Sequence, residues 1–389
     1  MNCLKPFIAA IATLMTLSAH AAVDKLSYFK NTYEESDAHF NEIYTKQRAS
    51  IKGSEVYQFL YAHGNIKSYF FPSENSDNLL IMISGTHGVE GFTGSAVQRY
   101  LVDQGLPVEH TSVLLIHGFN LWGFKNIRRV NENNIDLNRN FVIDRNHFKP
   151  DDSDYGKLNS FLNPQTPGSA GLISNGFFIA RAVSNIAEYS LESLRASVLK
   201  GQYSFENGLF YGGRDPQAQE LLIDQLVQRY IHKQKKVFLI DLHTGYGERS
   251  KLHLLAGRTT DPNSKNLKKV FLENEVDFAD KKKFYVIEGE MLTFFGDRIV
   301  KKIPQAEVIC ITFEYGTLDS QKTLGSIESL RRMVLENQNF HHPAGEVDAA
   351  DIKNIYREMF YPSDPEWRMS VLNQTDEKIK KIYDYLKLQ

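Results

Sequence analysis

The sequence has few cysteines, few tryptophans and no excess of charge of either sign. Its 389 residues include two Cys and two Trp, and 45 basic residues nearly balance 47 acidic ones, for a formal net charge of −2 at pH 7. Because no block of like charge is present, nothing in the composition indicates a nucleic-acid partner or an anionic membrane surface. The 42% hydrophobic and 24% charged fractions are those of a folded globular chain and argue against disorder.

The sequence also lacks an apolar run long enough to cross a membrane, although its N-terminus is apolar. Lys5 precedes the apolar stretch Phe7–Leu17, which is followed by an Ala-His-Ala triplet at positions 19–21. This order is typical of a secretory signal peptide, whereas a transmembrane helix needs roughly 20 apolar residues. We therefore expect residues 1–21 to be cleaved and residues 22–389 to be exported as a single domain, periplasmic or secreted, without stable membrane insertion.

Cysteine is too scarce to stabilise such a chain through disulfides. Cys3 lies in the predicted signal, which leaves Cys310 alone in the mature chain and excludes an internal disulfide. Cys310 lies within an apolar run and is expected to be a buried small hydrophobic residue. The exported protein must therefore be held together by its hydrophobic core.

Apolar runs alternate with amphipathic segments along the chain. Most predicted strands are continuous apolar runs, the pattern of strands buried on both faces. Strands that alternate with helices predict a layered α/β fold around a sheet, and the polar stretch Val142–Gly168 is predicted to cross the surface. The predicted strands are Leu79–Ser84, Ser112–His117, Lys236–Leu242, Lys251–Ala256, Lys283–Glu288 and Glu307–Glu314. The predicted helices are Gly94–Asp103, Ile173–Val198, Pro216–Lys233 (with Asp215 as its N-cap) and Ser326–Gln338.

Imidazole and carboxylate side chains lie at the ends of three predicted strands. His87 and Glu90 follow the first strand, His243 ends the third, and Glu314 ends the last. Ligands of open α/β sheets gather at the carboxyl ends of the strands. We therefore hypothesise that the sheet brings these four side chains together.

The spacing of His87 and Glu90 favours a metal site. If the Gly-Val between them forms one helical turn, both side chains project to the same side. A nitrogen of His243 would complete a His-Glu-His set with an open position, the pattern of a catalytic zinc site. An H-x-x-E pair alone is weak support, because such residues more often cap a helix or face solvent. Asp241, two residues before His243 on a strand, faces the same way and is a candidate to orient it.

A polar segment strengthens the hypothesis of a metal site. Residues 128–141 read RRVNENNIDLNRNF, whose simplest interpretation is an asparagine-rich turn. However, the motifs GTHGVEG, DLNRNF, DLHTG and FEYG occur in the order and approximate spacing of one known family. The chain resembles, over residues 79–317, the zinc carboxypeptidase superfamily, which includes succinylglutamate desuccinylase and aspartoacylase. The resemblance is strongest to a largely uncharacterised bacterial branch.

The resemblance implies a three-layer α/β/α sandwich around a mostly parallel or mixed twisted sheet, with one bound zinc ion. It implies the zinc ligands His87, Glu90 and His243. Glu314 matches the general base, which takes a proton from a water molecule whose pKa zinc has lowered. Asn138 and Arg139 match the pair that holds a substrate carboxylate, for which a guanidinium offers a planar fork.

The arginine that polarises the scissile carbonyl is less clearly aligned. In the deacylase branch it lies a few residues nearer the Asn-Arg pair than Arg129 does here, and Arg128 is equally available. We assign the catalytic role to Arg129 and keep Arg128 as a substrate contact. The tyrosine that closes over substrate in digestive carboxypeptidases cannot be aligned. Candidates for substrate contact are Tyr246, Tyr211 and Tyr285, and Arg214 in FYGGRD.

The predicted function is a zinc-dependent hydrolase that cleaves an amide bond next to a free carboxylate. A carboxypeptidase acting on small peptides is the first choice, because export places the enzyme among peptides and cell-wall fragments. The alternative within the superfamily is deacylation of an N-acyl amino acid. A non-catalytic binding protein that retains the crevice is a third hypothesis, which Glu314 weakens because a pure binder needs no general base. The sequence leaves the oligomeric state open.

Overall fold

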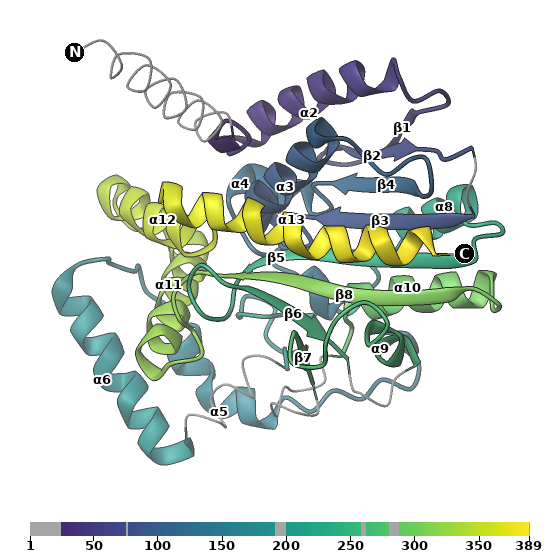
Figure 1. The fold of residues 1–389 in the computed structure, drawn as a ribbon. Helices are drawn as coiled ribbons and strands as arrows, with labels where there is room; N and C mark the ends of the chain where they lie inside the picture. The colour runs from purple at the N-terminus through teal and green to yellow at the C-terminus, as the bar shows by residue number, and fades with distance from the viewer. Residues whose placement is uncertain (1–24, 75–76, 191–199, 258–261, 280–287, 389) are drawn as a thin grey trace, which may run out of the picture.

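A mixed eight-stranded sheet forms the centre of the molecule (Figure 1). The computed structural model describes residues 25–74, 77–190, 200–257, 262–279 and 288–388. Within them, the order of strands across the sheet is β1-β2-β4-β3-β5-β8-β6-β7. The strands are β1 (Glu55–Tyr61), β2 (Gly64–Phe71), β3 (Asn78–Ser84), β4 (Ser112–His117), β5 (Lys236–Gly245), β6 (Leu252–Ala256), β7 (Val276–Phe278) and β8 (Glu307–Gly316).

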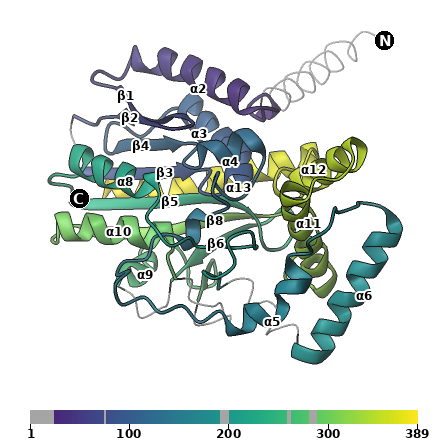
Figure 2. The same cartoon turned by 180° about the vertical axis from the view of Figure 1, so that it is seen from behind.

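Helices cover both faces of this sheet. Helices α3 (Gly91–Gln104) and α13 (Pro365–Lys387) lie on one face, with α2 (Tyr33–Arg48) packed beside α3. Helices α8 (Ala218–Tyr230) and α10 (Met291–Lys302) lie on the other face, as the reverse view shows (Figure 2). The predicted three-layer α/β/α arrangement is confirmed.

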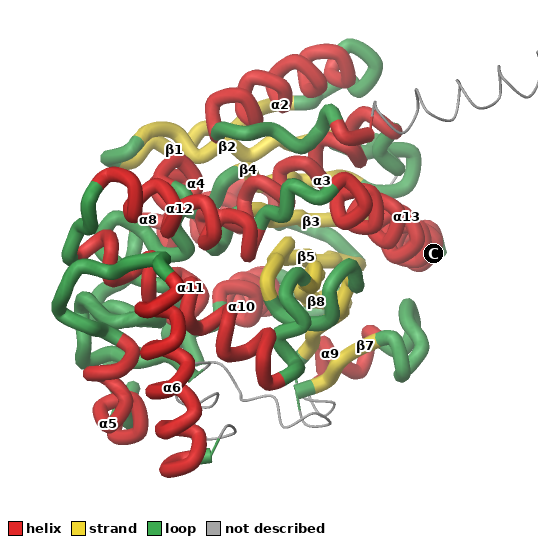
Figure 3. The backbone as a smooth tube through the Cα atoms, turned by 90° about the vertical axis from the view of Figure 1, so that its left-hand side faces the viewer, coloured by secondary structure: helices red, strands yellow, loops and turns green. Residues whose placement is uncertain are grey.

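A group of helices gathers at one end of the sheet (Figures 1 and 3). The carboxyl ends of β3 and β4 point toward this end, where α12 contacts the end of β5. Buried side chains of these helices form a second hydrophobic cluster, separate from the principal core around the sheet. The group comprises α5 (Ser153–Leu162), α6 (Leu172–Tyr189), α11 (Thr323–His341) and α12 (Glu346–Phe360). The short helix α4 (Leu121–Asn126) contacts α11 and α12, whereas α9 (Pro262–Leu267) packs against β8.

The central strands match the continuous apolar runs of the sequence. β3 pairs in parallel with β4 and β5, and β5 pairs in parallel with β8. Every residue of β3 after Asn78 is buried, because helices cover both faces of the sheet. β2 pairs antiparallel with β1 and β4, and β6 pairs antiparallel with β8 but in parallel with β7, so the sheet is mixed.

Several boundaries differ from the sequence predictions. The third predicted helix begins at Ala218 with Gln217 as its N-cap, so the assignment of Asp215 and Pro216 to its start is wrong. The stretch predicted to cross the surface contains α5, whose apolar side chains are buried in the second cluster. Three predictions lie wholly or partly outside the described residues. The signal peptide lies in residues 1–24, the strand predicted up to residue 288 reaches into residues 280–287, and the end of the second predicted helix lies in residues 191–199. In the described part of the chain, no helix is both long and apolar enough to span a bilayer.

Candidate active site

The H-x-x-E motif forms a tight turn directly after β3. Residues Gly88–Glu90 make one 3-10 turn, which places His87 Nδ1 2.9 Å from Glu90 Oε1. Gly88 is required here, because a Cβ atom would lie 2.1 Å from the carbonyl carbon of Gly123. The predicted helical turn is confirmed, and we call His87–Glu90 the metal turn.

The end of β5 brings the third side chain to the metal turn. His243 Nδ1 lies 2.9 Å from Glu90 Oε2 and 3.1 Å from His87 Nδ1. Ligand atoms of these three residues all lie within 4.8 Å of one another, and all three side chains are buried. The backbone N–H of Thr244 also donates to Glu90 Oε2 at 3.0 Å. The hypothesis that strand ends converge is confirmed for the three predicted ligands.

The outer nitrogens of the two histidines are held by carboxylates. His87 Nε2 lies 3.1 Å from Asp136 Oδ1, and His243 Nε2 lies 2.6 Å from Asp241 Oδ2. If each Nε2 donates its proton to the carboxylate, both Nδ1 lone pairs face each other beside Glu90. The two Nδ1 lone pairs and the Glu90 carboxylate repel one another unless a cation or a proton lies between them. The donor set therefore fits a metal ion.

Protonation competes with a metal at this position. Burial lowers the pKa of His243, but the carboxylates of Asp241 and Glu90 outweigh it and raise that pKa well above its usual value. A metal ion bound to the same nitrogen must displace the proton, so metal affinity is expected to rise with pH.

Glu314 lies beside His243 in the parallel register of β8 and β5. Its Oε1 accepts a hydrogen bond from the backbone N–H of Tyr246 at 2.9 Å. Burial, helped by the negative charge of Glu90, raises the pKa of Glu314 to about 8. A carboxyl group with a pKa near neutrality can both accept and return a proton, as a general base requires.

The two adjacent arginines lie in different environments. Arg129 Nη1 donates to Glu90 Oε1 at 3.2 Å, and its Nε donates to Asp136 Oδ2 at 3.0 Å. Arg128 instead donates from Nε to Glu336 Oε1 at 2.9 Å on α11. The geometry therefore supports Arg129 as the arginine beside the metal ligands. It does not support Arg128 as a substrate contact, because its guanidinium is buried and bonded to Glu336, Asn134 and Asn337.

Asn138 and Arg139 lie in a second 3-10 turn, Leu137–Arg139. Asn138 Oδ1 accepts from the backbone N–H of Met291 at 2.9 Å, which ties the turn to α10. Arg139 is 2% exposed, and its Nη1 donates to the Asn138 carbonyl at 2.8 Å. Burial lowers the pKa of Arg139, and Asp136 partly offsets this effect. A buried guanidinium of this kind is suited to bind a carboxylate.

The remaining predicted substrate contacts receive unequal support. Tyr246 adjoins the site through its backbone bond to Glu314. Arg214 has a side chain that is 68% exposed and lies 3.5 Å from Glu206, a surface position. Tyr211 is buried and its carbonyl accepts from the Asp136 N–H, and Tyr285 lies outside the described residues.

Asp136 is the site residue to which the sequence analysis assigned no role. Its two oxygens contact His87 and Arg129, and it also caps the turn that carries Asn138. Burial raises the pKa of Asp136, but the charges of Arg129 and His87 outweigh it and hold that pKa well below its usual value. The sequence feature that could have indicated Asp136 is its position two residues before Asn138 in the motif DLNR. The predicted role of Asp241 as a partner of His243 is confirmed.

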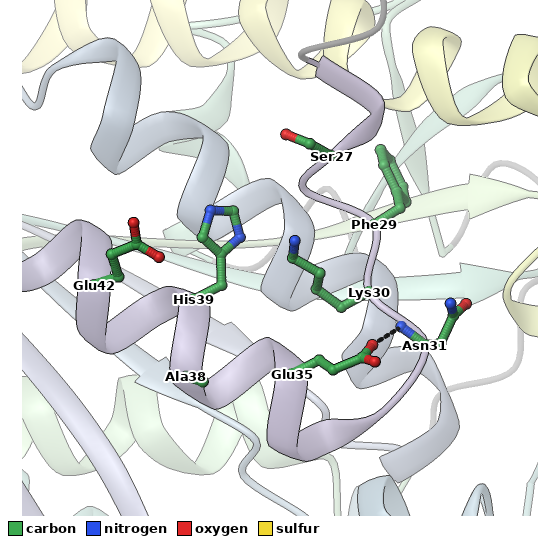
Figure 4. Close-up of a pocket in the computed structure, with 8 residues that line it drawn as sticks. All are labelled: Ser27, Phe29, Lys30, Asn31, Glu35, Ala38, His39 and Glu42. Carbon is green, nitrogen blue, oxygen red and sulfur yellow. Dashed lines mark hydrogen bonds between the residues drawn. The ribbon is translucent and has the colours of Figure 1, made fainter.

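A surface cavity of about 610 Å³ lies away from these residues, at the start of α2 (Figure 4). Its lining mixes the cation Lys30 with the carboxylates Glu35 and Glu42, and Figure 4 shows Glu35 bonded to the Asn31 backbone. The cavity therefore shows no single charge preference. The lining residues are Ser27, Phe29, Lys30, Asn31, Glu35, Ala38, His39 and Glu42.

One protein family matches most of this chain. A family model described as protein of unknown function (DUF2817) matches residues 29–374, so the chain belongs to that family. A comparison with curated proteins found no match.

Three solved structures illustrate the similarities found. Bovine thrombin-activatable fibrinolysis inhibitor, in complex with tick carboxypeptidase inhibitor, is 13% identical with a TM-score of 0.46, covering 90% of this chain and 99% of that chain. Carboxypeptidase A from Helicoverpa armigera is 13% identical with a TM-score of 0.43, covering 85% and 74%. Murein-tripeptide amidase MpaA from Escherichia coli O157 is 16% identical with a TM-score of 0.36, covering 75% and 93%.

Proposed function

We propose that this member of the DUF2817 family is a zinc-dependent hydrolase that cleaves an amide bond next to a free carboxylate, in the manner of a carboxypeptidase. The observation that carries the proposal is the convergence of three ligand atoms within 4.8 Å, with Glu314 in register beside one of them. Two histidines and one carboxylate, with an open position for water, form the ligand pattern of catalytic zinc.

Each nearby residue has a definite task in this reaction. Zinc, when bound to His87, Glu90 and His243, supplies a water molecule of lowered pKa and polarises the carbonyl. Glu314 accepts the proton of the attacking water and returns it to the leaving amine. Arg129, whose side chain is 13% exposed, offers a fixed positive charge to the oxyanion that develops on the carbonyl oxygen.

Asn138 and Arg139 set the position of the substrate. Arg139 pairs with the free carboxylate of the substrate and so fixes the distance from that group to the scissile bond. Binding energy from a non-reacting group is then used to orient the amide at the metal. The proposed substrates are small peptides, and we propose that the enzyme is periplasmic or secreted, since residues 1–21 have the pattern of a signal peptide.

A turnover assay tests the proposal. The protein, loaded with one equivalent of zinc, is incubated with C-terminal dipeptides, muropeptide fragments and N-acyl amino acids, each as the free acid and as the C-terminal amide. We expect hydrolysis of free-acid peptides and little hydrolysis of the amides, because loss of the charge-assisted pair with Arg139 costs about 2–5 kcal/mol.

Other outcomes of this assay identify the alternatives. Preference for N-acyl amino acids would establish the deacylase instead of the carboxypeptidase. Equal cleavage of free acids and amides would overturn the role of Arg139. Zinc binding without any turnover across the panel would favour a binding protein.

A further inference from the structure

A buried ion pair joins the segment that contacts the metal turn to helix α11. Arg128 donates from Nε and Nη2 to the two carboxylate oxygens of Glu336, at 2.9 and 3.3 Å. Both side chains are almost fully buried, at 2% and 6% exposure. Burial raises the pKa of Glu336, but the charges of Arg128 and Lys353 outweigh it and hold that pKa below its usual value. The charges around Glu336 therefore favour its carboxylate form inside the protein.

Further contacts fix the Arg128 side chain in this place. Its Nη2 also donates to Asn134 and Asn337 at 3.2 and 3.3 Å, and the guanidinium stacks 3.7 Å above the Phe340 ring. Lys353 on α12 donates to the same Glu336 carboxylate at 3.1 Å. Segment 128–134 is thus attached to helices α11 and α12, which lie about 200 residues later in the chain.

The backbone of the same two arginines holds the metal turn. The Gly88 N–H donates to the Arg129 carbonyl at 3.1 Å, and the Val89 N–H donates to the Arg128 carbonyl at 2.9 Å. The metal turn has no side-chain cap of its own, so these carbonyls satisfy N–H groups that would otherwise lack partners at its first residues. A shift of residues 128 and 129 would therefore move Glu90.

Helix α12 also contacts the metal turn and the residues around it. The Tyr356 hydroxyl accepts the Arg129 N–H at 2.9 Å. Val89, in the centre of the metal turn, is fully buried in the second hydrophobic cluster together with Tyr356 and Phe360. The Phe360 carbonyl accepts from Thr244 Oγ1 at 2.6 Å, next to His243. The ends of both ligand-bearing segments therefore depend on α12.

We propose that Arg128 and Glu336 are positioning residues for the metal site: the ion pair fixes the carbonyls of residues 128 and 129, and these fix the turn that carries His87 and Glu90. Helices α11 and α12 thereby preorganise the ligands without contacting the metal. The inference rests on the metal site of the proposed function.

Zinc binding to the metal-free protein, without substrate, tests the inference. Glu336→Gln keeps the shape of the side chain but leaves Arg128 without its ionised partner. We expect its zinc dissociation constant to rise about 10-fold, the lower end of the range for loss of a direct partner of a metal ligand, because Glu336 acts through the backbone of residues 128 and 129. Tyr356→Phe removes only the acceptor of the Arg129 N–H, and we expect a smaller rise in the same direction.

Glu328→Gln is the matched control on the same helix. Glu328 is bonded to Arg331 and Arg332 at 2.7 Å, and none of its described contacts reaches residues 128 or 129. We expect this variant to lose some thermal stability and to bind zinc as the wild type does. If Glu336→Gln does not fold, Tyr356→Phe serves as the test against the same control.

The outcomes separate the inference from the proposed function. Wild-type zinc affinity in both Glu336→Gln and Tyr356→Phe would overturn the positioning role and leave the zinc site intact. Equal loss of zinc affinity in Glu328→Gln would also overturn it, because general destabilisation would then explain the effect. If the wild type itself binds no zinc, the proposed metal site and the inference both fail.

Discussion

Arg128 and Arg129 are adjacent and chemically identical, but their side chains bind different partners. Arg129 shares the carboxylates of Glu90 and Asp136, both of which also contact His87. Arg128 pairs with Glu336, a residue of a distant helix. The difference shows that one segment serves two purposes: Arg129 interacts with the carboxylates at the predicted ligands, and Arg128 anchors the segment to α11.

The two arginines also differ in which property of the protein their substitution should change. An arginine beside the ligands can stabilise charge that develops in the reaction, and its loss is expected to lower turnover. Removal of Arg128 would leave the buried Glu336 carboxylate with Lys353 as its remaining cation. Loss of one partner of a buried ion pair typically costs up to about 3–5 kcal/mol of stability. Turnover and stability are therefore the two measurements that distinguish the role of Arg129 from that of Arg128.

The largest effect is expected at the base that faces the ligands. Glu314→Gln keeps the shape of the side chain but cannot accept a proton, so turnover should fall about 10²–10⁴-fold. Zinc content, measured by elemental analysis, should stay at the wild-type level because the three ligands are unchanged. A variant that turns over at nearly the wild-type rate would show that Glu314 is not the base.

The next effect separates the two arginines directly. Arg129→Ala should lower turnover about 10²–10³-fold, as expected for loss of one donor to the oxyanion. Arg128→Ala should instead lower the melting temperature and weaken zinc binding. Steady-state kinetics at saturating zinc and thermal unfolding of both variants provide the measurement. The assignment of roles would have to be reversed if Arg128→Ala at full zinc occupancy were the slower enzyme.

A smaller effect is expected when Asp241, which contacts the predicted ligand His243 directly, is replaced. The remote pair Arg128–Glu336 contacts no predicted ligand. Asp241→Asn weakens the acceptor that holds His243 Nε2, and zinc affinity should fall about 10–100-fold. Asn retains an acceptor oxygen, so the ring should keep its orientation and zinc should still bind at high concentration. Zinc titration with a competing chelator measures the change. No change in affinity would mean that the hydrogen bond to Asp241 does not support the ligand.

The smallest effect concerns how the thermal stability of the metal-free protein depends on pH. The Glu314 carboxyl, with its pKa raised by burial from 4.5 to about 8, prefers the neutral form in the folded state. Its stabilising contribution is complete below the unfolded pKa and is lost as pH rises toward 8. Metal-free Glu314→Gln lacks this loss, so its melting temperature should exceed that of the wild type by a few degrees at pH 8. At pH 4.5 the two melting temperatures should converge. A constant difference at all pH values would show that the Glu314 pKa is not raised.

Elements with strong local patterns were predictable, whereas those that depend on partners were not. The runs that became β3, β5 and β8 are continuous and apolar, because strands buried on both faces need apolar residues at every position. Strand β1 escaped prediction because most of its residues are only half-buried, so no comparable run exists. Helices α12 and α13 carry polar exposed faces, and their apolar stripes pack only in the finished fold.

By itself, the sequence determined which chemistry is available and where along the chain it lies. His87, Glu90, His243 and Glu314 follow apolar runs at strand ends, and parallel pairing brings such ends to one edge of a sheet. The tertiary structure decided which arginine faces the ligands, and it gave Asp136 its two partners. These choices depend on contacts such as that of Arg128 with Glu336, 208 residues apart. No local pattern encodes them, because the free energy of a buried charge depends on the partners that only the assembled fold provides.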